Sequence, residues 1–240
     1  LDAGLIIVDE SSMMDMWLAR KFFSRIGPDT KVLLVGDADQ LQSVGAGDVF
    51  RELINCGLIP VTVLNEIFRQ KKDSLIAYNA QKINNNDTSF FFGNDFTVCK
   101  CANQEEAAEH IRNIYLAQVE QYGVDRVQIL SPFRSTGAAS ADQLNEVIRE
   151  LVNPQTEEAD LKVGSLYFRV GDKIMQNKNS TKASNGDIGF IRSFRHDERD
   201  GMRISIQFSP TRVVEYSMEE MGHVELAYAT TVHKAQGSEF

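Results

Sequence analysis

The sequence of 240 residues is poor in cysteine, and none of its apolar runs has the length of a membrane span. Its cysteines, Cys56, Cys99 and Cys101, complete no zinc pattern with a second cluster of Cys or His. No segment resembles a secretory leader. These absences exclude a disulfide-stapled secreted domain and a membrane protein, and we expect reduced thiols in a cytoplasmic protein that meets no membrane.

Positive charge is also scarce, since the formal net charge is −9 and the pI is about 5.0. This balance argues against a protein coated in basic residues for nucleic acid. Between Val163 and Val214, however, the sequence has nine Lys and Arg and five Asp and Glu, so the net charge of this segment is +4. The charge is therefore segregated, and a local basic groove is not excluded.

A phosphate loop of the form Gly-x-x-x-x-Gly-Lys-Ser/Thr is missing from the sequence. The sequence also opens at Leu1, without an initiator methionine and almost directly in an apolar run, and closes at Phe240 directly after a motif. We interpret it as a piece of a longer protein.

Two apolar runs that end abruptly in acidic or amide side chains are the most informative feature that is present. They are Gly4–Val8, followed by Asp9 and Glu10, and Val32–Val35, followed by Gly36-Asp37-Ala38-Asp39-Gln40. Apolar runs of this length indicate strands that are buried on both faces, as in a parallel sheet. Ligands of such sheets bind beyond the carboxyl ends of the strands, where these polar side chains would lie.

Nucleotide hydrolysis requires this combination of side chains at one edge. One carboxylate holds the magnesium shell, another orients or deprotonates the attacking water, and an amide senses the terminal phosphate. The alternative is that the acids are solvated loop residues, because a single Asp-Glu pair is a weak signal. Two such units, followed by Gln40-Leu41-Gln42-Ser43-Val44-Gly45-Ala46-Gly47, favour the nucleotide site.

The alternation of helical and strand patterns along the first two thirds of the chain predicts an α/β fold. Ser12-x-x-Asp15 resembles a capping box before an amphipathic helix that carries Met14, Trp17, Leu18 and Phe22. Further helices are predicted at 48–53, 74–83, 104–122 and 142–151, and further strands at 31–35, 61–64, 96–100 and 127–130.

From about Val163 the pattern changes to short strands between turn signals, of which Asn185-Gly186-Asp187 is the strongest. We predict a small, mostly β barrel inserted before the chain returns, at about Glu225, to the α/β unit. Its aromatic residues are expected to form the core rather than stacking platforms for bases; they are Phe168, Phe190, Phe194 and Phe208.

Four motifs occur in order: Val-Asp-Glu-Ser-Ser-Met-Met-Asp (8–15), Gly-Asp-Ala-Asp-Gln-Leu-Gln-Ser-Val-Gly-Ala-Gly (36–47), Leu-Asn-Glu-Ile-Phe-Arg-Gln (64–70) and Thr-Val-His-Lys-Ala-Gln-Gly-Ser-Glu-Phe (231–240). Together they resemble motifs II to V of superfamily 1 DNA helicases, in the RecD-like branch that includes the exodeoxyribonuclease V alpha subunit. The resemblance covers essentially the whole chain. Gln42 stands where that family typically has proline.

The resemblance implies ATP and Mg²⁺ as cofactors and assigns roles at the nucleotide. Asp9 resembles the aspartate that binds Mg²⁺ through water, Glu10 the catalytic base, and Asp37 and Gln40 the pair that links the γ-phosphate to the DNA-contacting surface. Arg69 resembles an arginine finger, although a surface salt bridge is the alternative for a residue in this basic run. Gly237 and Glu239 resemble the turn near the nucleotide, with Glu239 towards the ribose.

The same resemblance places Thr231, His233 and Lys234 on the surface that faces single-stranded DNA. Arg134, in the segment Ile-Leu-Ser-Pro-Phe-Arg, contacts a DNA phosphate or is a solvated loop residue, and both alternatives stay open at this point. The implied partners are single-stranded and duplex DNA, together with other subunits of a helicase–nuclease complex. The implied location is the bacterial cytoplasm.

The implied fold is two RecA-like motor domains, partial first and most of the second, with an SH3-like β-barrel insertion. The expected boundaries are 1–68 for the first motor domain, 69–162 with 225–240 for the second, and 163–224 for the insertion. The implied activity is an ATP-dependent helicase or translocase in DNA repair and recombination. Without the phosphate loop, this piece alone is expected neither to bind ATP tightly nor to hydrolyse it.

Two rival functions fit the same motifs. One is a non-catalytic nucleic-acid-binding or assembly subunit of a nuclease complex, in which the upstream phosphate loop would be lost. The other is the helicase half of a conjugative relaxase, for which an upstream nuclease domain rich in Tyr and His is expected.

Overall fold

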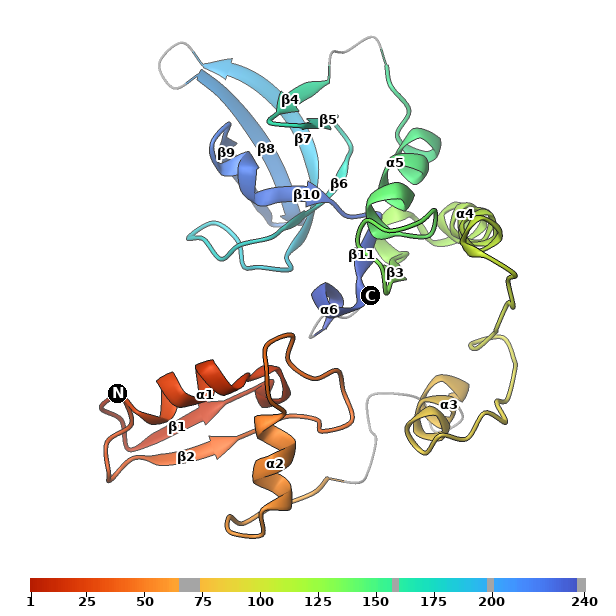
Figure 1. Cartoon of the computed structure of the whole chain (residues 1–240). Helices are drawn as coiled ribbons and strands as arrows, with labels where there is room; N and C mark the ends of the chain where they lie inside the picture. The colour runs from red at the N-terminus through yellow and green to blue at the C-terminus, as the bar shows by residue number, and fades with distance from the viewer. Residues whose placement is uncertain (65–73, 157–159, 198–200, 237–240) are drawn as a thin grey trace. The chain divides into compact units, whose positions relative to one another are not determined.

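In the computed structural model, which describes residues 1–64, 74–156, 160–197 and 201–236, the first apolar run forms strand β1 (Leu5–Val8). It pairs in parallel with β2 (Lys31–Leu34), with Leu5 opposite Lys31 and Val8 opposite Leu34. The 3₁₀ turn η1 (Ser11–Met13) and helix α1 (Met16–Phe23) connect the two strands (Figure 1). The predicted strand–helix–strand unit is confirmed, but the predicted burial of its strands on both faces is wrong for the described residues, since Leu5 and Ile7 are 53% and 60% exposed.

The start of α1 differs from the prediction, because Asp15, and not Ser12, is the capping residue. The Asp15 carboxylate accepts a hydrogen bond from the backbone N–H of Leu18 at 2.7 Å. Ser12 is buried inside the 3₁₀ turn, so its hydroxyl cannot reach the helix start. The turn takes up the residues that a capping box would have used.

Helices α2 (Val49–Asn55) and α3 (Leu75–Asn84) follow in the first unit and agree with the predicted positions. The strands predicted at 61–64 and 96–100 do not form in the described part of the chain, where only an isolated bridge joins Gly93 and Phe96. A strand requires ladder hydrogen bonds from a neighbour. Val63 is 69% exposed, so this extended segment packs against little.

The second unit begins with an α/β layer. It contains α4 (Gln104–Tyr122), the 3₁₀ turn η2 (Val124–Arg126), β3 (Ile129–Ser131) and α5 (Ala141–Val152). Near the other end of the chain, β11 (Ala229–Thr231) pairs in parallel with β3 and leads into α6 (Val232–Ala235). The core between helices and strands is made of Tyr115, Ile129, Ala141, Leu144, Ile148, Tyr228 and Ala229.

The inserted β region consists of a hairpin and an antiparallel sheet. The hairpin pairs β4 (Leu161–Val163) with β5 (Leu166–Phe168). In chain order, the strands of the sheet are β6 (Lys173–Gln176), β7 (Ile188–Asp197), β8 (Gly201–Ser209), β9 (Arg212–Ser217) and β10 (Val224–Leu226), and the 3₁₀ turn η3 (Glu220–His223) precedes β10. In space, the five strands lie in the order β10-β6-β7-β8-β9.

The core of this β region agrees in large part with the predicted aromatic core. Phe168 is fully buried, and Phe194 and Phe208 pack against the same cluster. Phe190 is half-buried. The predicted turn at Asn185-Gly186 precedes β7, and Gly186 adopts a positive φ of 93°, which glycine reaches without steric cost.

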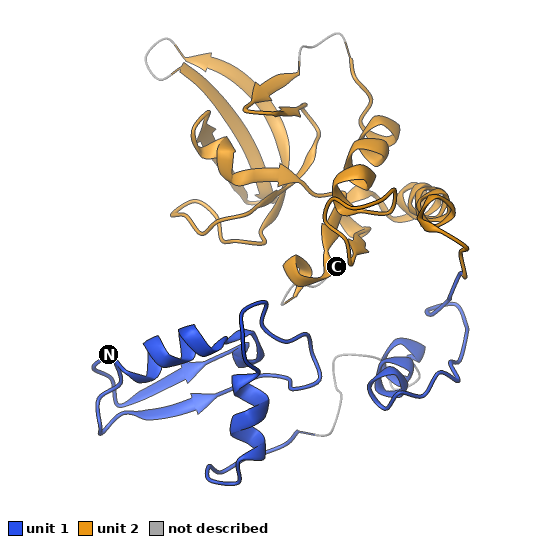
Figure 2. Cartoon of the chain, viewed as in Figure 1, with its two compact units in different colours: residues 1–99 blue, residues 100–240 orange. Residues whose placement is uncertain are grey.

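The chain divides into two compact units, residues 1–99 and 100–240 (Figure 2). The predicted boundary between residues 68 and 69 lies outside the described residues. The predicted insertion, 163–224, is close to the span of strands β4 to β10, and the full division into three domains stays a prediction. Among the described residues, no helix is long and apolar enough to span a membrane.

Candidate nucleotide and nucleic-acid sites

The first candidate site lies at the carboxyl edge of the β1–β2 sheet. Because the two strands are parallel and in register, Asp9 and Glu10 leave β1 at the edge where Asp37 follows β2. The backbone closes this edge beyond the strands, since the N–H of Val35 donates to Val8 O and the N–H of Ser11 donates to Val35 O, both at 2.8 Å. The structure therefore places all three residues at one edge of the sheet.

Glu10 adopts an unusual backbone conformation at this edge, with φ 51° and ψ 39°. A non-glycine residue in this left-handed region costs about 1 kcal/mol and persists only where its surroundings hold it. Here the N–H of Glu10 donates to Asp9 Oδ1 at 2.8 Å, and the carbonyl of Glu10 accepts from Met13 N at 3.0 Å. The strained turn sets the direction in which the exposed Glu10 side chain leaves the sheet.

Asp37 and Gln40 form a second local arrangement at the same edge. Gln40 Nε2 donates to Asp37 Oδ2 at 3.3 Å, and the backbone N–H of Asp39 donates to Asp37 Oδ1 at 3.0 Å. The Asp37 carboxylate thereby fixes the amide group of Gln40. The two predicted sensor residues are in direct contact.

Packing behind this edge involves residues that the sequence did not single out. A Cβ on Gly36 would lie 3.1 Å from Ser12 N and 3.2 Å from the Phe50 ring, so only glycine fits between η1 and α2 without a shift. Arg51 donates to the carbonyl of Ala38 and forms an ion pair with Asp48 at 2.9 Å. A basic residue one turn into a helix gives no sequence signal for such a contact.

Gln42, at the position where the resembling family has proline, has a defined role in the loop. Its Nε2 donates to Asp48 Oδ2 at 2.9 Å. Asp48 is also the N-cap of α2, where its carboxylate accepts from Arg51 N at 3.4 Å. The loop that proline would stiffen is tied here by a side-chain hydrogen bond.

Hard oxygen ligands at this edge suit Mg²⁺, which keeps several waters and takes one or two carboxylates together with phosphate oxygens. Within the described residues, no three His, Cys, Asp or Glu side chains lie close enough to hold a metal ion together. A Mg²⁺ ion at this edge would therefore take most of its ligands from water and phosphate, and Asp9 is the residue that the resemblance implies for it. Arg69, Gly237 and Glu239 lie outside the described residues.

The second candidate site lies at the carboxyl edge of the β3–β11 pair. Thr231 is opposite Ser131 in the register, and its side chain caps α6 by accepting from Lys234 N at 3.4 Å. His233 is exposed on the same helix. Three of the predicted DNA-facing residues thus share one short segment.

Arg134 reaches the same edge from the loop between β3 and α5. Ser131 shapes this loop, because its hydroxyl donates to Ala139 O at 2.7 Å and accepts from Phe133 N at 3.1 Å. The side chain of Arg134 is 67% exposed and lies 3.9 Å from Glu225 Oε2. Glu225 also forms an ion pair with Lys234. Sequence reasoning missed Glu225, because a single acid in a short strand carries no pattern.

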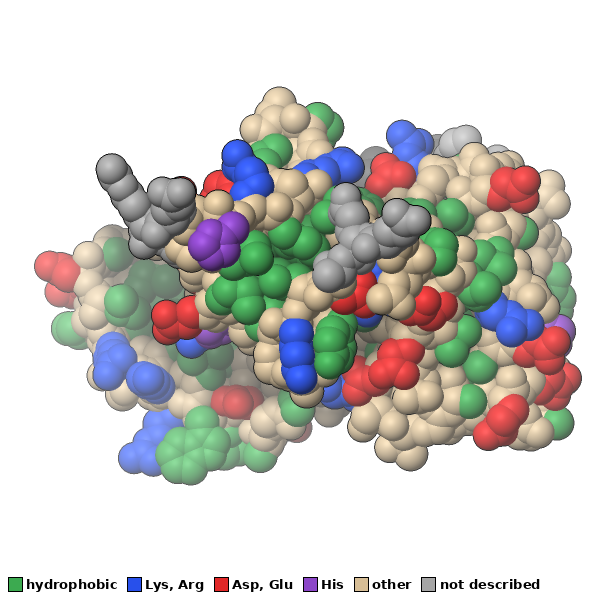
Figure 3. Space-filling view, turned by 90° about the horizontal axis from the view of Figure 1, so that it is seen from above, with side chains coloured by type: hydrophobic (Ala, Val, Ile, Leu, Met, Phe, Trp, Pro, Cys, Tyr) green, Lys and Arg blue, Asp and Glu red, His purple; other side chains and the backbone are tan. Residues whose placement is uncertain are grey.

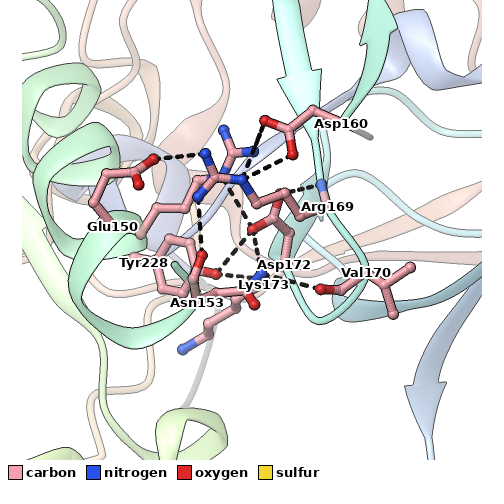
Figure 4. Close-up of polar contacts among 9 residues, drawn as sticks. Glu150, Asn153, Asp160, Arg169, Val170, Asp172, Lys173 and Tyr228 are labelled. Carbon is pink, nitrogen blue, oxygen red and sulfur yellow. Dashed lines mark hydrogen bonds and ion pairs between the residues drawn. The ribbon is translucent and has the colours of Figure 1, made fainter. Parts of the chain in front are cut away.

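A buried polar network joins α5 to the β region (Figure 4). Asp172, at 0% exposure, accepts from Arg169 N at 2.7 Å, from Asn153 Nδ2 at 2.8 Å and from the Tyr228 hydroxyl at 3.2 Å. Arg149 Nε lies 3.2 Å from the same carboxylate. Burial raises the pKa of Asp172, and these hydrogen bonds together with the charge of Arg149 oppose the rise.

The surrounding residues of the network are satisfied in the same way. Arg169 pairs with Asp160 at 3.0 Å and with Glu150 at 2.8 Å. Lys173, next to Asp172, donates from Nζ to the carbonyls of Val124 and Val127 at 3.0 and 2.8 Å. Burial lowers the pKa of Lys173 to about 8. This network is a structural junction between the helix layer and the sheet.

Much of the basic charge of the β region is compensated locally. Lys182 pairs with Glu220, Arg195 with Glu215 and Arg212 with Asp187. On the face drawn in Figure 3, Lys and Arg side chains of the described residues are interspersed with Asp and Glu. The basic excess of this region therefore does not form a uniform patch on that face.

Two family profiles match the chain. One, described as an AAA domain, matches residues 2–104, and one described as the SH3 domain of ATP-dependent RecD-like DNA helicases matches residues 144–208. The first profile covers the β1–β2 edge. The second begins within α5 and extends through most of β8.

Curated relatives named as RecD2 or RecD match nearly the whole of this chain. The chain is 31% identical to the ATP-dependent RecD2 DNA helicase of Deinococcus radiodurans, over 98% of this chain and 31% of that protein. It is 26% identical to the RecBCD enzyme subunit RecD of Mycolicibacterium smegmatis, over 100% of this chain and 44% of that protein. The chain thus spans less than half the length of either relative. A crystal structure of the Pif1 helicase from Bacteroides in complex with ADP-AlF3 and ssDNA aligns with 99% of this chain and 63% of that chain, at 18% identity and a TM-score of 0.43.

Proposed function

We propose that the chain belongs to the RecD-like DNA helicases of superfamily 1, which its matches support, and that it is part of a motor that couples ATP hydrolysis to movement on single-stranded DNA and to duplex unwinding. The single observation that carries this proposal is the acidic edge of the β1–β2 sheet. Asp9, Glu10 and Asp37 emerge there together, with the amide of Gln40 held by Asp37.

At this edge, Asp9 would hold Mg²⁺ through water, and Glu10 would accept the proton of the attacking water. Mg²⁺ supplies charge neutralisation at the phosphates of ATP. Gln40, oriented by Asp37, would contact the γ-phosphate. Arg69 would stabilise the charge that develops on the transferred phosphoryl group, and Gly237 and Glu239 would contact the nucleotide from the second motor domain.

On the DNA side, Thr231, His233 and Lys234 would contact the single strand, with Arg134 at a phosphate. The arrangement that supports this part is the shared edge of β3 and β11, where a capped helix start and two cationic side chains meet. Coupling requires nucleotide-facing and DNA-facing residues to lie on one rigid segment, as residues 231–239 would.

The names of the relatives also support a proposal about partners. One relative is named an ATP-dependent RecD2 DNA helicase, and others are named RecBCD enzyme subunit RecD. We therefore keep assembly with further subunits, in DNA repair and recombination, within the proposed function. We propose the bacterial cytoplasm as the location of this activity. A phosphate loop in the upstream coding sequence would favour the motor, and its loss would favour the assembly subunit.

The test is the ATPase rate of the intact protein with and without single-stranded oligo(dT), for the wild type and Glu10→Gln. We expect the wild type to be stimulated by DNA and the variant to lose about 10²–10⁴-fold in turnover, because a general base contributes that much. Binding of a fluorescent ATP analogue should be retained. Glu52→Gln, which removes an exposed acid in α2, is the matched control and should leave turnover unchanged.

Two outcomes would contradict the proposal. Near-normal turnover of Glu10→Gln would remove Glu10 from the role of base. The absence of any DNA-stimulated hydrolysis in an intact protein that carries a phosphate loop would overturn the motor function as a whole.

A further inference from the structure

Glu225 joins the two cationic side chains that the proposed DNA site depends on. Its Oε1 forms an ion pair with Lys234 Nζ, and its Oε2 lies 3.9 Å from the Arg134 guanidinium. The two cations come from different elements, α6 and the loop after β3, so one carboxylate links them across the edge of the β3–β11 pair.

The position of Glu225 is fixed from the side of the β region. It lies on β10, an edge strand of the five-stranded sheet, opposite Met175 of β6. Its side chain is 22% exposed, whereas that of Lys234 is 31% and that of Arg134 is 67% exposed. The carboxylate therefore lies deeper than the cations, and the guanidinium extends from it towards solvent.

We propose that Glu225 is a built-in competitor for phosphate, which occupies Arg134 and Lys234 until a DNA backbone displaces it. This inference rests on the proposed DNA-binding function of that edge. A phosphodiester and a carboxylate present the same chemistry to these cations, an anionic pair of oxygens that accepts charge-assisted hydrogen bonds. A phosphate can form full ion pairs with both cations only if the Glu225 carboxylate no longer pairs with them.

The competition has a use in a protein that steps along a strand. A motor must release each phosphate that it has bound, and a cation left without a partner in a half-buried site makes that release costly. An internal carboxylate that takes over the cations lowers this cost. The carboxylate thus lowers the affinity for DNA and speeds the release of its phosphates.

The experiment measures the affinity of the intact protein for fluorescein-labelled oligo(dT) by anisotropy, at several salt concentrations. Glu225→Gln keeps the shape of the side chain and removes its charge. We expect about five- to tenfold tighter binding, the size expected for removing one like charge close to a bound phosphate when water fully screens the pair. The dependence on salt should become steeper, because the freed cations neutralise phosphates more fully and DNA then releases more of its condensed counterions.

Glu215→Gln is the matched control, because it makes the same charge change in an exposed ion pair with Arg195 elsewhere in the unit. Its affinity should stay within about twofold of the wild type, since surface pairs contribute little. In a background that carries both Lys234→Met and Arg134→Ala, Glu225→Gln should lose most of its effect, because both cations for which the two anions compete are gone. Thermal melting of each variant checks the fold, and Glu225→Asp, which shortens the side chain and keeps the charge, should tighten binding less.

The outcomes separate this inference from the proposed function. If Lys234→Met weakens binding but Glu225→Gln tightens it no more than Glu215→Gln does, the site binds DNA and the competitor is wrong. If Glu225→Gln weakens binding, the carboxylate positions Lys234 rather than competing for it. If neither Lys234→Met nor Arg134→Ala changes the affinity for oligo(dT), the DNA site itself is wrong and the competitor falls with it.

Discussion

The two parallel-strand edges of the chain hold their polar side chains by different means. At the β1–β2 edge, hydrogen bonds between near neighbours and the strained backbone of Glu10 fix the acids. At the β3–β11 edge, Arg134 and Lys234 are held by Glu225, which arrives from another element. Local geometry thus sets the acidic edge, and long-range ion pairs set the basic one.

The difference suits the chemistry proposed for each edge. A hydrolytic site needs its acids in one fixed arrangement. Contacts between residues close in sequence provide that arrangement without contributions from distant elements. A surface that binds and releases a strand needs cations that change partners, and an ion pair can exchange where a backbone turn cannot. The predictions below test this contrast.

The largest expected effect separates hydrolysis from DNA binding. Arg69→Ala in the intact protein should lower turnover by about 10³-fold and leave the affinity for oligo(dT) within about twofold, because a finger acts on transition-state charge. Lys234→Met should do the reverse and weaken DNA binding several-fold. Steady-state ATPase and anisotropy measure both quantities, and an Arg69 variant that mainly loses DNA affinity would contradict the finger assignment.

A second prediction compares the buried junction with an exposed ion pair. Arg149→Met should lower the free energy of unfolding by about 3 kcal/mol, because it leaves the buried Asp172 without its cation. Arg195→Met removes an exposed partner of Glu215 and should cost less than about 1 kcal/mol. Urea denaturation gives both values, and equal losses would mean that the junction contributes no more than a surface pair.

A third prediction concerns pH. The pKa of Lys173 is about 8 in the folded protein and ordinarily 10.5, so between these values the unfolded chain binds more protons. The free energy of unfolding contributed by this group therefore rises from pH 8 to pH 10.5, on the order of 1–3 kcal/mol, and is lost as pH falls. Comparing the wild type with Lys173→Met at both ends of this range should show the rise only in the wild type. The same slope in both proteins would contradict the assignment.

The smallest expected effect tests the strained turn. Glu10→Gly should change the free energy of unfolding by less than about 1 kcal/mol, because relief of the left-handed strain offsets the added entropy of the unfolded chain. Met13→Gly, one turn later, has no such strain to relieve and should destabilise clearly more. If both substitutions destabilise equally, the left-handed backbone of Glu10 stores no strain that glycine relieves.

The sequence predicted most of the regular elements and the acidic edge, and the reason is that both are local. An apolar run followed by Asp-Glu defines a strand and the side chains beyond it within a few residues, as at Val8 to Glu10. The 3.6-residue pattern similarly gave α4 with its observed bounds. The return of the chain to the α/β unit at about Glu225 was also predicted, whereas strand β11 and its pairing with β3 were not.

The sequence could not predict features that depend on distant partners. Glu225, Arg149 and Asp172 are ordinary charged residues until the fold places them beside their counterions. The strand predicted at 61–64 has the right composition but no neighbour in the described chain. Ser12 matched the capping pattern, but Asp15 caps the helix, because the 3₁₀ turn shifts the helix start.

The parallel pairing of β3 with β11 has a consequence for how the protein is made. Ile129 lies opposite Ala229, so this pair closes a long loop that contains the whole β region. Loop closure over such a span is slow for an extended chain, and a region that collapses by itself shortens the effective span. During synthesis, β3 lacks its parallel partner until β11 has left the ribosome, and prior folding of the β region would bring the two strands within reach.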